Sequence, residues 1–327
     1  MNRKASLLAV ALMAIAAAGT APAVAAAPAL RADVTDGTLR ISGGQSAQKI
    51  ALRLSALDQN QLQVDVGDDG VADFSFDLAS FETIDVDAGN GDDTVRIDQV
   101  NGAFTTTKPT RISGENGDDT LIGGSGAEAF DGGNGDDFVD GNQGADTAFL
   151  DRGDDTFVWD QGDGSDVVEG GSGFDTQVFN GFGANEIMAA TAGGGRVLFT
   201  RVQGSIVMSL DDVEAIDVRP LSGTDTVTIN DLTGTDLRRV DVDLAAVLGG
   251  STADSQADTV TMIGTAGDDS ISADASGAAV EVSGLAAFVR ITHADAALDR
   301  LAIDTLGGDD TVTVDPTLGS LIQVSVQ

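Results

Sequence analysis

The chain has 327 residues, of which 53 are acidic and 17 basic, so its formal net charge is −36. Such an excess of negative charge repels nucleic acid and anionic lipid and attracts divalent cations. Glycine is frequent at 42 residues, proline is scarce at 5, and cysteine is absent. These numbers exclude a collagen-like chain, a proline-rich linker and a fold held together by disulfides.

Residues 1–26 have the order of a secretory signal peptide. Arg3 and Lys4 precede an apolar stretch at 5–18, and small residues follow it up to Ala25 and Ala26. This order predicts cleavage there and export from the cell. The alternative, a membrane anchor, is disfavoured because the apolar stretch is shorter than the roughly 20 residues needed to span a bilayer. No other segment approaches that length, so we expect a secreted protein with no membrane span.

Residues 27–113 are predicted to form an N-terminal β-rich segment. Short alternating runs such as ALRLSAL and QLQVDV, bounded by Gly, Asp or Asn, are typical of strands. The stretch DVGDDGVAD at 65–73 loosely resembles a calcium-binding EF-hand loop. However, its third position is Gly67, and its twelfth is Phe76 rather than Glu. We therefore interpret it as a hairpin turn.

A nine-residue pattern runs through residues 114–178, with Gly at the fourth position of each unit and an acidic residue at the sixth. Trp159 and Asp160 are inserted after the fifth unit. An isolated unit, AGNGDDTVR, lies upstream at 88–96, and weaker echoes lie at 264–272 and 305–313. The units are GENGDDTLI, GGSGAEAFD, GGNGDDFVD, GNQGADTAF, LDRGDDTFV, QGDGSDVVE and GGSGFDTQV.

The spacing of this pattern predicts a coil of short strands. Glycine accepts positive φ and close backbone contact, so the first part of each unit can form a tight turn. The last three residues then form a minimal strand with one inward side chain, and stacked coils lie about 4.8 Å apart. The predicted inward side chains are Leu121, Phe130, Val139, Ala148, Phe157 and Val168.

Stacking also places the sixth-position carboxylates in rows at two edges. Residues 114–178 hold 17 acidic side chains against Arg152 alone, so basic side chains cannot neutralise these rows. A hard dication with carboxylate and carbonyl ligands can, and calcium is favoured because magnesium demands stricter geometry and keeps its waters. The predicted rows are Asp119, Asp137, Asp155 and Asp175 on one edge, and Glu128, Asp146 and Asp166 on the other.

The pattern resembles the nonapeptide of the RTX, or haemolysin-type calcium-binding, repeat family. The resemblance implies a parallel β-roll over 114–180, with calcium ions held between turns n and n+2. The flanks are similar to those of secreted bacterial calcium-binding proteins that embed such repeats. Up to about five ions are implied, held by the pairs Asp119–Asp137, Glu128–Asp146, Asp137–Asp155, Asp146–Asp166 and Asp155–Asp175.

Two departures from the repeat concern the turns. Glu128 replaces Asp and is one methylene longer, which is expected to weaken its site. Leu150 and Asp151 replace a Gly-Gly pair, which is expected to strain that turn.

Two further departures concern the coil itself. The insertion of Trp159 and Asp160 is expected to bulge the roll and to weaken the pairing of Asp146 with Asp166. Gln177 occupies a position meant for an apolar side chain, which predicts that the roll ends there.

Residues 181–327 are predicted to form a C-terminal β-rich, β-helix-like segment. GTDTVTIN at 223–230 and ADTVTMI at 257–263 share a D-T-V-T core with residues 310–314. DAALDRL at 295–301 is the best candidate for a helical turn. The whole chain is therefore predicted to be all-β, a parallel β-roll flanked by irregular β-rich segments.

Motifs for catalysis are missing from the sequence. There is no cysteine, no Gly-x-Ser-x-Gly elbow and no His-Glu-x-x-His motif. His293 is the only histidine, so a zinc site or a catalytic base there is not expected. Trp159 could stack on a sugar, but a lone aromatic residue at a strand bulge is more often a packing residue. We expect a protein that is not an enzyme.

Three hypotheses for function remain. The leading one is a secreted calcium-binding protein with a structural or adhesive role at the cell surface or in a matrix, whose folding is coupled to calcium. The alternative is a carbohydrate-active or sugar-binding β-helix protein stabilised by calcium. A third is a calcium-gated assembly subunit whose strand-rich ends pair with neighbours. Calcium is the expected partner, and glycans or further copies of the chain are candidates beside it.

Overall fold

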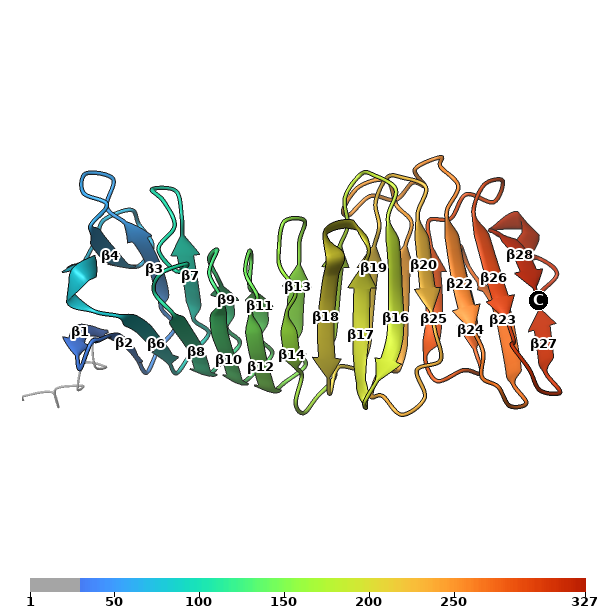
Figure 1. The fold of residues 1–327 in the computed structure, drawn as a ribbon, viewed down its shortest axis with the longest axis horizontal. Coiled ribbons are helices and arrows are strands. Elements are labelled where there is room, and N and C mark those ends of the chain that lie inside the picture. The colour runs from blue at the N-terminus through green and yellow to red at the C-terminus, as the bar shows by residue number, and fades with distance from the viewer. Residues whose placement is uncertain (1–29) are drawn as a thin grey trace, which may run out of the picture.

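Figure 1 shows an elongated solenoid whose chain alternates between two long sheets. The computed structural model describes residues 30–327. The signal peptide expected at 1–26 lies outside these residues. Within them the regular structure is all strand apart from three short 3-10 helices, η1 (Leu78–Ser80), η2 (Gln203–Ser205) and η3 (Leu318–Ser320). The predicted all-β class is confirmed.

Within residues 30–327, sheet A has 14 strands that follow one another along the solenoid. They are β1 (Arg31–Thr35), β2 (Thr38–Gly44), β6 (Thr83–Gly89), β8 (Thr110–Asn116), β10 (Glu128–Asn134), β12 (Thr147–Arg152), β14 (Val167–Glu169), β18 (Ile206–Asp211), β17 (Arg196–Arg201), β16 (Ile187–Gly193), β20 (Thr226–Ile229), β22 (Thr259–Ile263), β26 (Arg300–Asp304) and β28 (Gln323–Val326).

Sheet B runs alongside it in the same direction along the solenoid. Its strands are β5 (Phe74–Asp77), β4 (Gln61–Val66), β3 (Lys49–Leu54), β7 (Thr94–Asp98), β9 (Thr120–Ile122), β11 (Phe138–Asp140), β13 (Thr156–Trp159), β15 (Thr176–Asn180), β19 (Ala215–Arg219), β21 (Arg239–Asp243), β25 (Phe288–Thr292), β24 (Ala279–Ser283), β23 (Ser270–Ser276) and β27 (Thr311–Val314).

Regular parallel coils occupy the chain from β6 to β15. A strand of sheet A is followed by a strand of sheet B, and each pairs in parallel with the strand one coil away. Equivalent residues of neighbouring coils are 18 apart in the repeat, and 20 apart across the Trp159-Asp160 insertion. The predicted parallel β-roll is confirmed.

The space between the two sheets is filled by the inward side chains of these strands. All six side chains predicted to point inward are at most 1% exposed, and the aliphatic and aromatic side chains of both flanks continue the same core. The strands are short, so each coil of the repeat contributes only about two large side chains to this core. Stability in this part of the molecule therefore depends on contacts between coils rather than on a deep interior.

Both sheets continue beyond Gln177, where the nonapeptide roll was predicted to end. This side chain is fully buried, and its strand β15 pairs on one side with β13 and on the other with β19. The Gln177 side-chain nitrogen donates to the Val178 carbonyl at 2.9 Å, which gives part of the amide a partner inside the core. Backbone pairing thus carries both sheets onward to β27 and β28.

Three antiparallel meanders interrupt the parallel order: β3–β4–β5, β16–β17–β18 and β23–β24–β25. In the second and third, the last strand of the meander pairs in parallel with an earlier coil and the first strand with a later one. The solenoid therefore continues through them without a break in either sheet. Both sheets also run unbroken across the boundaries predicted at 114 and 180.

The helical turn expected in DAALDRL is limited to residues 295–299. There the Leu298 and Asp299 amides donate to the Asp295 carbonyl at 3.1 and 2.8 Å. Arg300 already belongs to strand β26, and Leu301 after it is fully buried in the core. The alternation of buried and exposed side chains overrides helix propensity from that point on.

Candidate metal centre

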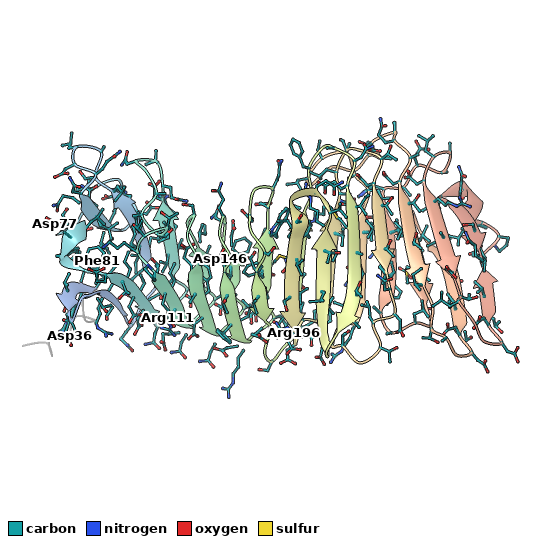
Figure 2. The ribbon with its side chains drawn as sticks, in the orientation of Figure 1. Asp36, Asp77, Phe81, Arg111, Asp146 and Arg196 are labelled. Carbon is teal, nitrogen blue, oxygen red and sulfur yellow. The ribbon has the colours of Figure 1, made fainter. Side chains whose placement is uncertain are left out.

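Acidic side chains precede the strands of both sheets and form two rows at opposite edges of the roll. Consecutive strands belong to different sheets and run in opposite directions, so residues that begin strands of sheet A and of sheet B lie at different edges. Figure 2 labels Asp146 among these short strands. The A row is Glu128, Asp146 and Asp166, and the B row is Asp93, Asp119, Asp137, Asp155, Asp175 and Glu214.

Backbone hydrogen bonds connect the members of each row. The amide of Asp119 donates to Asp137 Oδ1 at 2.8 Å, and the amide of Asp137 donates to Asp155 Oδ1 at 2.7 Å. The same bond joins the other predicted pairs, at 2.7 Å, 2.8 Å and 2.9 Å. All five pairs predicted from the repeat are therefore brought together by the fold. These pairs are Asp119–Asp137, Glu128–Asp146, Asp137–Asp155, Asp146–Asp166 and Asp155–Asp175.

The second oxygen of most of these carboxylates has no hydrogen-bond partner. Every predicted ligand is at most 3% exposed, so water in bulk cannot solvate it. A buried carboxylate oxygen without a partner is costly, because it has lost its hydration and gained nothing in return. Such oxygens require a cation or a proton. They are Asp93 Oδ2, Asp119 Oδ2, Glu128 Oε1, Asp137 Oδ2, Asp146 Oδ2, Asp155 Oδ2 and Asp175 Oδ2.

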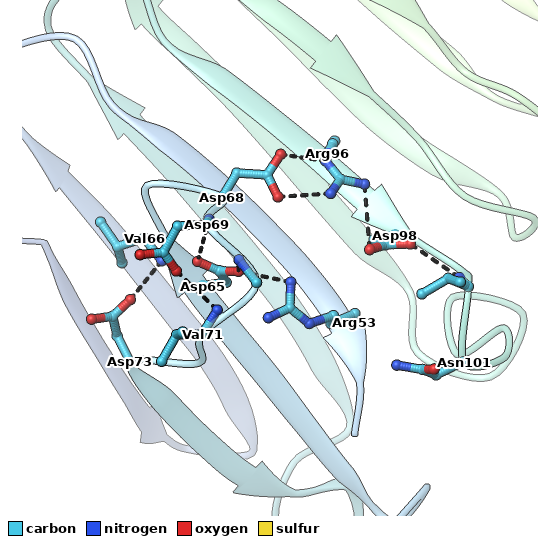
Figure 3. A network of polar contacts seen from close by, with 12 residues as sticks. Arg53, Asp65, Val66, Asp68, Asp69, Val71, Asp73, Arg96, Asp98 and Asn101 are labelled. Carbon is cyan, nitrogen blue, oxygen red and sulfur yellow. Dashed lines mark hydrogen bonds and ion pairs between the residues drawn. The ribbon is translucent and has the colours of Figure 1, made fainter. Parts of the chain in front are cut away.

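Asp65 shows how the same chain satisfies a buried carboxylate by itself. This side chain is fully buried near the end of β4, and Arg53 pairs with its Oδ2 at 2.7 Å. The amides of Asp69 and Gly70 donate to it at 3.2 and 2.8 Å, as Figure 3 shows for the surrounding network. The hairpin interpretation of 65–73 is confirmed. None of the seven predicted ligands of the roll has such an arginine partner.

A carbonyl of the next coil lies close to the unpartnered oxygens of Asp119 and Asp137 in the B row. A methyl group added to Gly114 would lie 2.2 Å from Asp119 Oδ2 and 2.6 Å from the Gly132 carbonyl oxygen. At Gly132 it would lie 2.5 Å from Asp137 Oδ2 and 2.7 Å from the Leu150 carbonyl oxygen. At Gly114 and Gly132, glycine leaves this space free, so that a carboxylate and a carbonyl lie side by side.

Burial raises the pKa of these carboxyl groups well above the usual value for aspartate. Loss of solvation is the main cause, and the charges of neighbouring carboxylates add to it. The pKa is raised to about 7 for Asp119, Asp137 and Asp155, and to about 9 for Asp146. Near neutral pH without a cation, Asp146 therefore holds a proton, and Asp119, Asp137 and Asp155 hold one for part of the time.

The donor set fits calcium. All groups that face the gaps are oxygens, from carboxylates and main-chain carbonyls, and hard dications prefer such ligands. Within residues 30–327 no three His, Cys, Asp or Glu side chains gather around one point. This agrees with gaps that combine carboxylates of two coils with backbone carbonyls. A bound calcium ion would supply the positive charge that the rows lack.

One expected weakness of the repeat is absent from the structure. Asp166 Oδ1 still accepts the Asp146 amide at 2.8 Å, so the pair that the insertion was expected to weaken is kept. The insertion is accommodated in the loop before Asp166, where the Trp159 indole donates to the Gly164 carbonyl at 2.8 Å. Glu128 keeps its place in the A row, because its amide donates to Asp146.

Two other residues behave as the sequence indicated. Trp159 is 1% exposed and stacks on Phe179 with ring centroids 4.0 Å apart, so it is a packing residue and cannot reach a sugar. Asp151, which replaces a glycine, has a φ of 72°, a conformation that is strained for a residue with a side chain.

Sequence reasoning missed both ends of the B row. Asp93 precedes β7, and its amide donates to Asp119 Oδ1 at 2.7 Å. Its signal was the isolated unit at 88–96, which a long loop separates from the next unit. At the other end, the Asp175 amide donates to Glu214 Oε2 at 2.9 Å. No repeat surrounds Glu214, so nothing in the spacing indicated it.

A parallel β-roll whose buried gaps are lined with oxygens belongs to the class of solenoids that can hold calcium. Its repeats are similar to those of the RTX family: the profile of the RTX calcium-binding nonapeptide repeat matches the chain in four copies, at residues 110–139, 122–157, 160–176 and 261–276. The first three copies contain all seven predicted ligands. The fourth lies in the C-terminal part, over β22 and β23.

Among solved structures, the chain is similar to the extracellular lipase LipA from Serratia marcescens, with 14% identity and a TM-score of 0.20. The alignment covers 65% of this chain and 43% of the lipase, so the chain spans less than half of the length of that protein. A comparison with curated proteins finds no match. Within the described residues, no helix has the length and apolar character that crossing a membrane requires.

Proposed function

We propose that this protein is a secreted, non-enzymatic calcium-binding β-roll with a structural or adhesive role, and that its folding is coupled to calcium. The observation that carries the proposal is the series of buried carboxylate oxygens without partners between the coils of 114–178. A cation that enters these gaps binds the folded coil and not the unfolded chain, so its binding free energy becomes folding free energy.

The seven predicted ligands are proposed to hold these ions. The carboxylates orient each other through the amide-to-Oδ1 bonds, and the free oxygens face the neighbouring carbonyls. Their near-complete burial also supports the non-enzymatic role, because a substrate outside the roll cannot touch them. The signal-peptide pattern and the lack of cysteine support a secreted protein that uses calcium in place of disulfides.

Isothermal calorimetry and circular dichroism on the full chain test this proposal. We expect several ions per chain, with affinities of about 10⁻⁴–10⁻³ M, the range of extracellular calcium modules. Removal of calcium should cause a reversible loss of strand signal, and magnesium should restore little of it. A spectrum that is unchanged by a chelator, together with no binding heat, would contradict the proposal.

A further inference from the structure

A second series of buried carboxylates lies beyond the nonapeptide repeats, in the part of sheet A that follows the second meander. Asp225 precedes β20 and Asp258 precedes β22, and they are 1% and 2% exposed. The Glu186 amide donates to Asp225 Oδ1 at 2.7 Å, and the Asp225 amide donates to Asp258 Oδ1 at 2.8 Å. This is the same bonding pattern as in the roll.

The sequences around these residues differ from the repeat. PLSGTDTVT at 220–228 and ADSQADTVT at 253–261 lack the paired glycines at the start of the unit. The RTX profile matches neither Asp225 nor Asp258. The fold therefore aligns Asp225 with Asp258, although neither lies in a match to the nonapeptide repeat.

The protein satisfies Asp299 at one end of this series and one oxygen of Glu186 at the other, while Glu186 Oε2 has no hydrogen-bond partner. At one end the Arg201 guanidinium of β17 pairs with Glu186 Oε1, with Nε at 2.9 Å. At the other end both oxygens of Asp299 accept backbone amides, from Asp258 at 3.0 Å and from Asp295 at 2.6 Å.

The two middle carboxylates have no such compensation. Asp225 Oδ2 and Asp258 Oδ2 are buried and have no hydrogen-bond partner. A third carboxylate, Asp254, lies at the same turn, where its Oδ2 accepts the Gly223 amide at 2.8 Å. Negative charge therefore accumulates at one edge of β20 and β22, with Asp225 Oδ2 and Asp258 Oδ2 left without a partner beside Glu186 Oε2.

We infer that Asp225 and Asp258 form a second site for a divalent cation with oxygen ligands, of the calcium class, between β20 and β22. The site is separate from the nonapeptide rows, because the second meander lies between them and places Met208 and Phe199 where the A row would continue. A cation at this site joins the coils of β20 and β22, which lie beyond the nonapeptide rows.

The variant pair Asp225→Asn and Asp258→Asn, made together in the full chain, tests the inference. Asparagine keeps the acceptor that each backbone amide uses and removes the charge. By calorimetry with calcium chloride, we expect at least one ion fewer per chain, with the remaining heats unchanged. In calcium-free buffer the variant should melt at a higher temperature than the wild type, because the uncompensated charge is gone. Asp231→Asn is the control, since Asp231 is exposed and its Oδ1 accepts the Thr233 amide at 2.9 Å.

Anomalous scattering from crystals soaked in a terbium salt locates the ion directly, and the expected peak lies between Asp225 and Asp258. No peak there, with an unchanged ion count in the double variant, would overturn the inference and indicate that these carboxylates hold protons instead. Asp137→Asn separates the two proposals. If it lowers the ion count while the double variant does not, the second site fails and the calcium-binding roll stands. If neither changes binding, both fail.

Discussion

Asp137 shows how one side chain serves two coils in the roll. Its Oδ1 accepts the Asp119 amide at 2.8 Å, its own amide donates to Asp155, and its Oδ2 lies beside Gly132. One oxygen therefore holds the neighbouring backbone in place while the other faces a gap. An interior member of a row takes part in two gaps, so its loss affects more than one ion.

For this reason Asp137→Asn is expected to reduce calcium binding at two gaps at once. Asparagine still accepts the Asp119 amide, so the coil geometry is kept and only the charge is lost. We expect the affinity at both gaps to fall by more than about tenfold, or about 1.4 kcal/mol each, in a calorimetric titration. Asp136→Asn is the matched control, because Asp136 is exposed and its Oδ1 accepts the Asp154 amide at 2.8 Å. Equal losses from both variants would contradict the assignment.

The raised pKa values of the rows predict an unusual dependence of stability on pH. The pKa of Asp137 and of Asp155 is about 7 in the folded chain, against an ordinary value of 3.8. Folding of the calcium-free chain therefore takes up protons, and the stability that this gives is complete below about pH 4 and is lost as the pH rises through 7. In calcium-free buffer, the melting temperature should be higher at pH 5 than at pH 8.

Saturating calcium should reverse that order, because the ion binds the deprotonated carboxylates. Melting curves at pH 5, 6, 7 and 8, with and without calcium, measure both trends. A calcium-free chain that is more stable at pH 8 than at pH 5 would show that these carboxylates are compensated in some other way.

At the scale of the elements, close stacking of turns determines which residues the repeat tolerates. Gly135 has a φ of 133°, and a methyl group on it would lie 2.0 Å from the Gly117 carbonyl oxygen of the preceding coil. Gly162 also has a positive φ, 114°, but the nearest atom to such a methyl group is Gln143 Nε2 at 4.0 Å. Substitutions at these two glycines therefore measure separately the cost of the backbone conformation and the cost of the contact between stacked turns.

Gly162→Ala should cost only the backbone strain, about 1–3 kcal/mol. Gly135→Ala should cost clearly more, since it also forces two coils apart and disturbs the gaps on either side. Urea denaturation in saturating calcium measures the free energy of unfolding of both variants. If the two losses are equal within error, contact between the turns does not explain why glycine occupies the fourth position.

The nonapeptide region was predictable from the sequence because its period is fixed. Once the register is known, spacing alone assigns the inward side chains and pairs the carboxylates, and the structure places Val139 and Asp137 accordingly. The flanks have no fixed period. The local patterns of MAATAGGG and RVLFTR do not indicate that β16 pairs with β17 and that β17 pairs with β18.

The three meanders are followed by segments of similar sequence, a similarity that the strand patterns alone did not reveal. Each meander is followed by a strand of related sequence and then by another acidic turn: TIDV and GDDTV, AIDV and GTDTV, LAID and GDDTV. One structural module therefore occurs three times along the solenoid. Long and variable meander loops hide this repetition from a search at a single period.

Across the whole molecule, stability is expected to be a sum of local terms, because each coil touches only its neighbours. The two kinds of coil neutralise buried carboxylates differently. In the first two meanders, arginines do so: Arg53 pairs with Asp65, and Arg201 pairs with Glu186. In the roll between them, the seven predicted ligands have no basic partner, and the unpartnered oxygens of six of them require a cation or protons. Calcium removal should therefore destabilise the nonapeptide roll, in the middle of the solenoid, more than the first two meanders.

Hydrogen exchange measured by mass spectrometry, with calcium and with a chelator at pH 8, tests this expectation segment by segment. Peptides from β9 to β15 should exchange at least about tenfold faster in the chelator, which corresponds to a loss of roughly 1.4 kcal/mol of local stability. Peptides from β3, β4, β16 and β17 should change much less, because their buried charges are paired within the protein. Asp137→Asn should raise exchange in the roll in calcium, whereas Asp136→Asn should not. A uniform change along the chain would mean that the solenoid unfolds as a single cooperative unit, and that calcium stabilises the meanders as much as the roll.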